Sequence, residues 1–151
     1  MWLQEVQEPR APFTNSEGLR GPMAMGVSVE WANAEQTVIL WTITGQWTWT
    51  QFDTAYDQMK QMAASVSHNI DGIYDLRQSI LIPADVTTHV KFAFPYRPPN
   101  LRHIIAVGLD SYIQLLWNTL TTMPSLRQWR AQFADTMEEA YAFIEKANTG
   151  K

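Results

Sequence analysis

Residues 69–88, NIDGIYDLRQSILIPADVTT, decide how the rest of the chain is interpreted. The apolar start predicts a short buried strand, 70–74, that ends on Asp75. A polar turn at 77–79 then leads into a helix opened by Pro83. In open α/β sheets the ligand or partner surface lies where strands end and helices begin. The segment therefore predicts the place of a functional surface, but no particular activity.

The composition predicts a globular protein that does not bind nucleic acid. The chain has 151 residues, of which 46% are hydrophobic and 17% charged, enough apolar material for one core. Its 15 acidic and 11 basic residues give a net charge of -4, so its overall field repels phosphate backbones. The absence of cysteine excludes disulfides, thiolate nucleophiles and cysteine-ligated zinc.

The limits of the domain follow from a change of pattern. Residues 1–24 contain three prolines and few regularly spaced apolar positions, which predicts a flexible N-terminal extension before a single domain at 25–148. Met23 or Met25 is an alternative start. No apolar run reaches the roughly 18 to 20 residues of a membrane helix, and the first residues do not resemble a secretory signal. We therefore predict a cytoplasmic protein.

The order of the elements predicts an α/β fold. Apolar residues alternate in 27–31 and again in 37–44, which indicates a hairpin. Short β-branched or apolar runs at 103–107 and around 132–133 predict two further strands after the central one. We expect a mixed, largely parallel five-stranded sheet that starts with the antiparallel hairpin.

About four helices should pack on this sheet. Thr48 and Gln51 have the spacing of a capping box, in which each side chain satisfies a backbone donor of the first helical turn. A second helix is predicted at 83–94, and a third after Asp110. Asp135 and Glu138, again three residues apart, predict the cap of the last helix.

The common catalytic and cofactor-binding motifs are missing. The chain contains no GxGxxG, GxxxxGK[ST], GxSxG or HExxH sequence. Asp85 and His89 lie four residues apart on one face of a predicted helix, but they fall short of the three or four ligands of a zinc site unless His68 or His103 lies nearby. A solvated contact within the helix is the simpler interpretation. We predict no metal, no cofactor and no catalytic residue.

Polar side chains just beyond the predicted strand ends are the candidate interaction residues. They are Asp75, Arg77, Ser79, Asp85, Asp110 and Ser111, together with Trp47. Capping alone explains Asp110, and a mutual salt bridge is as good an explanation for Asp75 and Arg77 as binding is. Trp47 and Trp49 flank the capping Thr48, and an exposed indole there would suit a partner surface, although packing over the helix start is simpler.

One basic and aromatic cluster offers an alternative surface. It comprises Lys91, Arg97, Arg102 and His103 interleaved with Phe92, Phe94 and Tyr96. Such a cluster could receive an anionic group or an acidic partner, but a cluster this small is simpler to explain as a solvated rim.

The sequence resembles the STAS-like group of bacterial proteins, which have the fold of the SpoIIAA anti-sigma-factor antagonists. The resemblance rests on the element order, the hairpin start and three segments, IYDLRQS, RPPNLRHIIAVG and FADTMEEAYAFIEK. It covers about residues 26–147. It implies a small α/β domain with a mixed sheet, helices mainly on one face, and a regulatory interaction in place of catalysis.

The chain departs from the antagonists at their phosphorylation site. The resemblance implies DLS after the central strand and an Asp-Ser-Ser-Gly element at the next helix, whose serine is phosphorylated. Here Arg77 follows Asp75 and Leu76, and Pro83, Ala84 and Asp85 stand where the serine and glycine are expected. The resemblance thus predicts the fold without this phosphorylation switch, and Ser79 is the nearest substitute hydroxyl.

Three functions follow as competing predictions. The first is a non-enzymatic STAS-like domain that binds another protein around Trp47, residues 75–79 and the helix opened by Pro83. The alternative is binding or sensing of a small apolar or lipid-like ligand, suggested by the aromatic and methionine content. The third, an enzyme that uses Asp75 or the Asp85 and His89 pair, has the least support.

Overall fold

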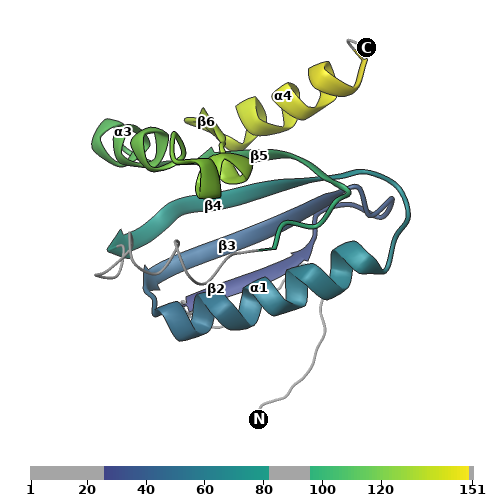
Figure 1. Ribbon diagram of the computed structural model, residues 1–151, viewed down its shortest axis with the longest axis horizontal. Coiled ribbons are helices and arrows are strands. Elements are labelled where there is room, and N and C mark those ends of the chain that lie inside the picture. The colour runs from purple at the N-terminus through teal and green to yellow at the C-terminus, as the bar shows by residue number, and fades with distance from the viewer. Residues whose placement is uncertain (1–25, 82–95, 150–151) are drawn as a thin grey trace.

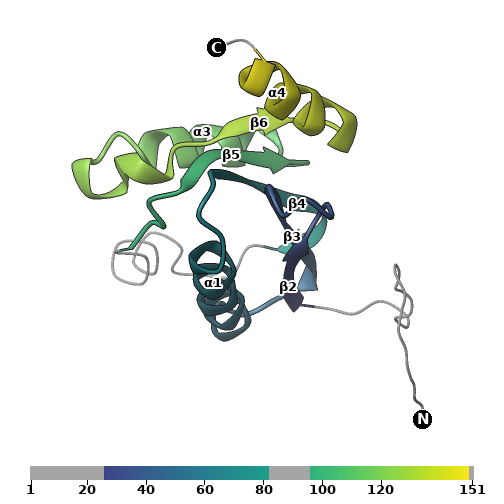
Figure 2. The same cartoon turned by 90° about the vertical axis from the view of Figure 1, so that its right-hand side faces the viewer.

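A five-stranded mixed sheet with helices on both faces forms the protein (Figure 1, Figure 2). The computed structural model describes residues 26–81 and 96–149. The strands lie in the order β2-β3-β4-β5-β6. They span Gly26–Trp31 (β2), Val38–Gln46 (β3), Ile70–Leu81 (β4), Leu101–Val107 (β5) and Gln132–Ala134 (β6). The β2 and β3 pair is antiparallel and every other pair is parallel, which confirms the predicted α/β class, the hairpin and the central place of β4.

The described residues contain three α-helices rather than about four. They are α1 (Trp49–Ala64), α3 (Ser111–Leu120) and α4 (Met137–Thr149), and a short 3₁₀ helix, η2 (Pro124–Trp129), follows α3. The helix predicted at 83–94 lies outside the described residues. In the described part of the chain, no helix combines the length and the apolar character needed to cross a bilayer.

Local capping explains where the helices begin. The Thr48 hydroxyl accepts from the Gln51 amide at 3.1 Å while the Gln51 side chain accepts from the Thr48 amide at 2.9 Å, so the predicted capping box is present at α1. Asp110 caps α3 by accepting from the Ile113 amide at 2.9 Å.

The predicted cap of α4 is wrong by one residue. Thr136, not Asp135, accepts from the backbone amide three residues later, that of Glu139. The Glu139 carboxylate in turn accepts from the Asp135 amide, so this acid takes the place predicted for Glu138. Spacing alone could not separate these two registers, because the sequence offers a capping residue and an acid in both.

The sheet separates two apolar cores. On one face, Ile39, Trp41 and Ile70 pack with α1 and with the segment formed by α3 and η2. On the opposite face, Ile73 and Ile105 pack against α4. Figure 2 shows α1 and α3 on one side of the strands and α4 on the other, so the helices occupy both faces.

The central strand is much longer than predicted. We expected a strand at 70–74 followed by a turn, whereas β4 continues through Leu81 and residues 77–79 belong to the strand. Two register shifts in the pairing with β3, between Thr42 and Thr44 and between Gly45 and Gln46, accommodate extra residues in β4. The polar run DLRQS has the composition of a turn. The sequence does not reveal the bulges, nor the hydrogen-bond partners that Asp75 and Ser79 find in the fold.

Candidate functional site

Asp75 and Arg77 form a two-point ion pair on β4. The Arg77 Nε and Nη2 atoms donate to the two carboxylate oxygens of Asp75, each at 2.9 Å. The Arg77 backbone amide donates to the same carboxylate at 3.1 Å. These hydrogen bonds with Asp75 raise the pKa of the Arg77 guanidinium. Of the two predicted explanations for this pair, the salt bridge is therefore the arrangement found, and it leaves 48% of the Arg77 side chain exposed.

The turn after β5 packs closely against Arg77 of β4. Gly108 follows β5 directly and has a φ of +89°, a conformation that side-chain-bearing residues rarely adopt. A Cβ atom at this position would lie 2.7 Å from the Arg77 Cγ and 2.9 Å from its Cα. Only glycine permits this approach without a shift of β4. The close contact brings the loop that leads to Asp110 alongside Arg77.

Helix α4 supplies a phenol and a carboxylate near this ion pair. Burial raises the pKa of Tyr141, and the negative charges of Asp75 and Glu30 raise it further. Glu138, one turn earlier on α4, acts electrostatically on Arg77. The carboxyl end of β4 is therefore a mixed-charge surface in which the acidic groups balance its arginine.

Trp47 is a buried support and not an exposed contact residue. Its exposed fraction is 6%, and its indole N–H donates to the Ser79 hydroxyl at 2.9 Å. Its ring packs edge-on against Trp49, with centroids 5.0 Å apart, and also against Phe52. The prediction of Trp47 as a surface residue is corrected by this burial, and Ser79 is occupied as its hydrogen-bond acceptor.

The exposed residues at this end of the sheet come from β4 and from the start of α3. Arg77 and Gln78 are exposed on β4, and Asp110 and Ser111 are exposed at the first turn of α3. We call these four residues the carboxyl-edge surface. Asp85, which was predicted to belong to it, lies outside the described residues.

A second charged cluster, not predicted from the sequence, surrounds Asp71 at the amino end of β4. Its carboxylate accepts from the His103 backbone amide at 3.1 Å and from the His103 ring Nδ1 at 2.9 Å. Arg102 donates to it through Nε at 3.3 Å and Nη2 at 3.0 Å, and also contacts Asn148 of α4. A single extra residue in β5 brings the two basic side chains together, because Ile70 pairs with Leu101 while Gly72 pairs with Ile104.

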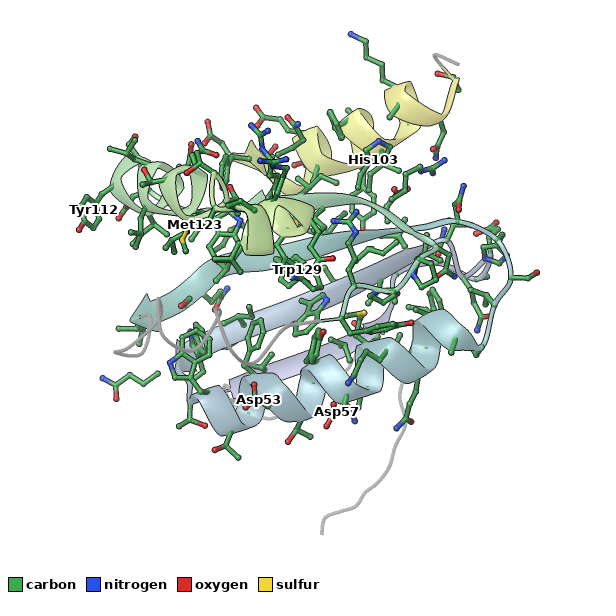
Figure 3. All side chains as sticks on the ribbon, in the orientation of Figure 1. Asp53, Asp57, His103, Tyr112, Met123 and Trp129 are labelled. Atoms are coloured by element: carbon green, nitrogen blue, oxygen red, sulfur yellow. The ribbon has the colours of Figure 1, made fainter. Side chains whose placement is uncertain are left out.

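The Asp71 and His103 pair resembles two members of a catalytic triad, but its contacts are those of a pair that stabilises the fold. The carboxylate fixes the proton of His103 on Nδ1, since a carboxylate only accepts. Among the described residues, no hydroxyl hydrogen-bonds the other ring nitrogen, and the ring packs edge-on against Phe143 between the sheet and α4 (Figure 3). No group of three or more metal-ligating side chains occurs within residues 26–81 and 96–149. One sequence signal could have revealed this cluster: an aspartate in an otherwise apolar central strand requires a cationic partner.

The predicted basic rim is used within the fold. The Arg97 guanidinium donates to the backbone carbonyls of Leu101 and Arg102, each at 2.9 Å, and also to that of Gln128. Burial lowers its pKa. Together with the pairing of Arg102 and His103 to Asp71, these contacts leave no unpaired basic patch among the described members of the cluster. Lys91, Phe92 and Phe94 lie outside the described residues.

Aromatic rings line the face of the sheet that carries α1. Trp41 stacks on Tyr74 and on Phe52, with centroids 4.7 and 5.0 Å apart. Trp129 of η2 points inward towards α1, where it meets Tyr56 (Figure 3). Burial raises the pKa of Tyr56 to about 12 and also raises that of Tyr74. Both phenols therefore stay protonated at neutral pH.

A scan against protein-family models and a search of curated proteins found no match to this chain.

Proposed function

We propose that the chain is a STAS-like, non-enzymatic domain that binds another protein through the carboxyl-edge surface. The observation that carries this proposal is the Arg77 guanidinium, which Asp75 holds at two points while half of the side chain faces solvent. An arginine fixed in this way loses little conformational entropy when a partner's carboxylate or carbonyl group approaches it. Arginine is also among the residues that contribute most to protein interfaces.

The use of the polar groups supports recognition in place of reaction chemistry. Asp75 is paired with Arg77, Asp110 caps α3, and Ser79 accepts from Trp47. An active site needs at least one nucleophile, base or Lewis acid that is free to meet a substrate. The candidate catalytic groups at this edge are instead engaged within the fold, whereas Gln78 and Ser111 extend the exposed polar surface around Arg77.

The regulatory part of the proposal rests on the resemblance. Pro83, Ala84 and Asp85 stand where the antagonists carry their phosphorylated serine, so phosphorylation at that position cannot control this chain. In our proposal the partner recognises a fixed surface. Recognition then depends on the Arg77 guanidinium, which needs no modification to be charged.

Affinity capture from the native cell tests the proposal. Proteins that bind through the carboxyl-edge surface should be retained by the wild-type chain and lost with Arg77→Glu, because that substitution reverses the exposed charge. Arg130→Glu reverses another exposed arginine, just after η2, and should retain them. Arg77→Glu also breaks the ion pair with Asp75. Ser111→Glu alters the same surface, keeps the ion pair, and should also lose the captured proteins. An identical set of captured proteins for all four chains would contradict the proposal.

A second function, binding of a small apolar or lipid-like ligand, is favoured by Tyr74. Its phenol lies in a desolvated, aromatic environment, yet it makes no hydrogen bond to any other residue that the structure describes. An apolar ligand with one acceptor group would satisfy this hydroxyl. Titration with a long-chain fatty acid distinguishes this function, because Tyr74→Phe should weaken such binding while Arg77→Glu should not.

A further inference from the structure

The central strand extends beyond its neighbour on one side. β4 continues to Leu81, whereas its pairing with β5 ends where Asp75 meets Val107. On the other side β4 remains paired with β3 as far as Leu81, opposite Gln46. Within the described parts of the chain, no strand pairs with the β5-side edge of residues 76–81. Such an edge exposes backbone N–H and C=O groups that can pair with another chain.

The side chains of this open edge lack the usual protection against strand pairing. Proteins commonly guard open edges with lysine, proline or an unpaired charge. Residues 76–81, LRQSIL, contain one charged side chain, and Asp75 neutralises it. Ile80 is 68% exposed, a large fraction for an isoleucine in a strand. Gly108 lies against Arg77, so the stretch of this edge that could pair with another chain is residues 78–81.

Helix α3 adds an uncharged apolar surface at the same end of the molecule. Tyr112 is 71% exposed and Leu115 is 65% exposed, one helical turn apart. In Figure 3, Tyr112 extends outward at the end of the molecule where β4 also terminates. Residues 111–126 contain no charged side chain. Tyr112 and Leu115 therefore form an apolar, uncharged patch at the same end of the molecule as the open edge.

We propose that the open edge of β4 pairs, antiparallel, with the same edge of a second copy of this chain. Antiparallel pairing across a two-fold axis is self-complementary, because each copy supplies the groups that the other lacks. Two identical surfaces usually repel through their like charges, but here the ion pair and the uncharged α3 reduce that cost. Pairing would place a second strand next to Ile80 in each copy. The inference builds on the proposed function, since it places a copy of the chain beside the carboxyl-edge surface.

Sedimentation velocity of the full chain tests this inference. We expect a reversible monomer and dimer equilibrium between micromolar and submillimolar protein. Ile80→Lys should raise the dimer dissociation constant by about 5-fold or more, because a lysine on an edge strand opposes pairing with a second chain. Ile80→Val keeps the apolar side chain and should keep the dimer. Tyr96→Lys places a lysine at a different exposed hydrophobic position, outside β4, and should leave the equilibrium unchanged.

Two results would overturn the inference: a wild-type chain that stays monomeric over the whole concentration range, or a dimer that Ile80→Lys leaves intact. Circular dichroism confirms that each variant is folded, which is expected because Ile80 is mostly exposed. A concentration-dependent slowing of amide exchange at residues 78–81 provides an independent readout. The capture experiment with Arg77→Glu is scored separately, so a monomeric chain would refute the dimer without refuting the docking surface.

Discussion

The two ends of β4 carry similar ion pairs in different surroundings. At the amino end, Asp71 pairs with Arg102, and the side chain of Asp71 is 1% exposed while that of Arg102 is 27% exposed. At the carboxyl end, the corresponding values are 12% for Asp75 and 48% for Arg77. Both arginines bond both oxygens of their aspartate, so residue type and bonding pattern are the same.

The difference lies in what covers each pair. Helix α4 lies over the Asp71 cluster, and Asn148 and Phe143 of this helix contact Arg102 and His103. Beyond Asp75, β5 has ended and the described helices leave half of Arg77 in solvent. A covered ion pair contributes to the fold, because removal of one partner leaves a buried charge. A half-exposed pair contributes little to stability and keeps a charged group available for recognition.

The largest expected effect comes from the covered end. Asp71→Asn leaves the Arg102 charge without a counterion in a largely buried site, so the free energy of unfolding should fall by about 3 to 5 kcal/mol. Urea denaturation measures this change. The control is Asp57→Asn, because Asp57 is 66% exposed where it pairs with Lys60 and its loss should cost less than about 0.5 kcal/mol. Equal losses for both variants would contradict the distinction between covered and exposed pairs.

Substitution of Gly108, which packs against Arg77, should lower the free energy of unfolding by an intermediate amount. Gly108→Ala places a Cβ atom within 3.0 Å of the Arg77 backbone at a φ of +89°, and should cost about 1 to 3 kcal/mol. Gly72→Ala, near the amino end of β4, is the matched control. A Cβ there would meet its nearest neighbours at 3.6 and 3.7 Å, which are ordinary contacts, so we expect a much smaller change. A thermal unfolding series compares the two variants, and a larger loss for Gly72→Ala would show that the Arg77 contact is not tight.

The smallest effect is expected at the exposed pair itself. Asp75→Asn should lower the free energy of unfolding by only about 1 kcal/mol, because Arg77 can be solvated when its partner is lost. The same substitution should lower the pKa of Tyr141, since the Asp75 charge disfavours the phenolate. Burial, the larger cause, would still hold that pKa above its ordinary value. NMR titration of the tyrosine ring measures the change, and Asp57→Asn should leave it unaltered.

Much of the framework could be predicted because its signals are local. The Thr48 and Gln51 capping box depends on residues three apart, and the hairpin depends on alternation within a few residues. The length of β4 could not be predicted in this way. Its polar second half is held by pairing with β3 and by the bond between Ser79 and Trp47, which is 32 residues away in sequence.

The sequence indicated where the candidate residues lie in the fold, but not which contacts they make. Asp75 and Arg77 were identified from their position after an apolar strand, and they lie on the central strand where the parallel strands end. Which of the two neighbouring indoles is buried could not be predicted, because Trp47 and Trp49 both pack against Phe52 and the burial of Trp47 also depends on Ser79, which is distant in sequence. An aspartate in an apolar strand indicates that Asp71 needs a cationic partner, but the identity of its partners depends on an extra residue in β5 and could not be predicted.

The sequence by itself determined the order of strands and helices, most of the caps, and the absence of the common catalytic motifs, because these depend on residues close together along the chain. Only the tertiary structure decided which aspartate is covered and which arginine faces solvent. Burial is a property of elements that meet from distant parts of the sequence, and burial determines whether a charged group stabilises the fold or remains free to recognise a partner.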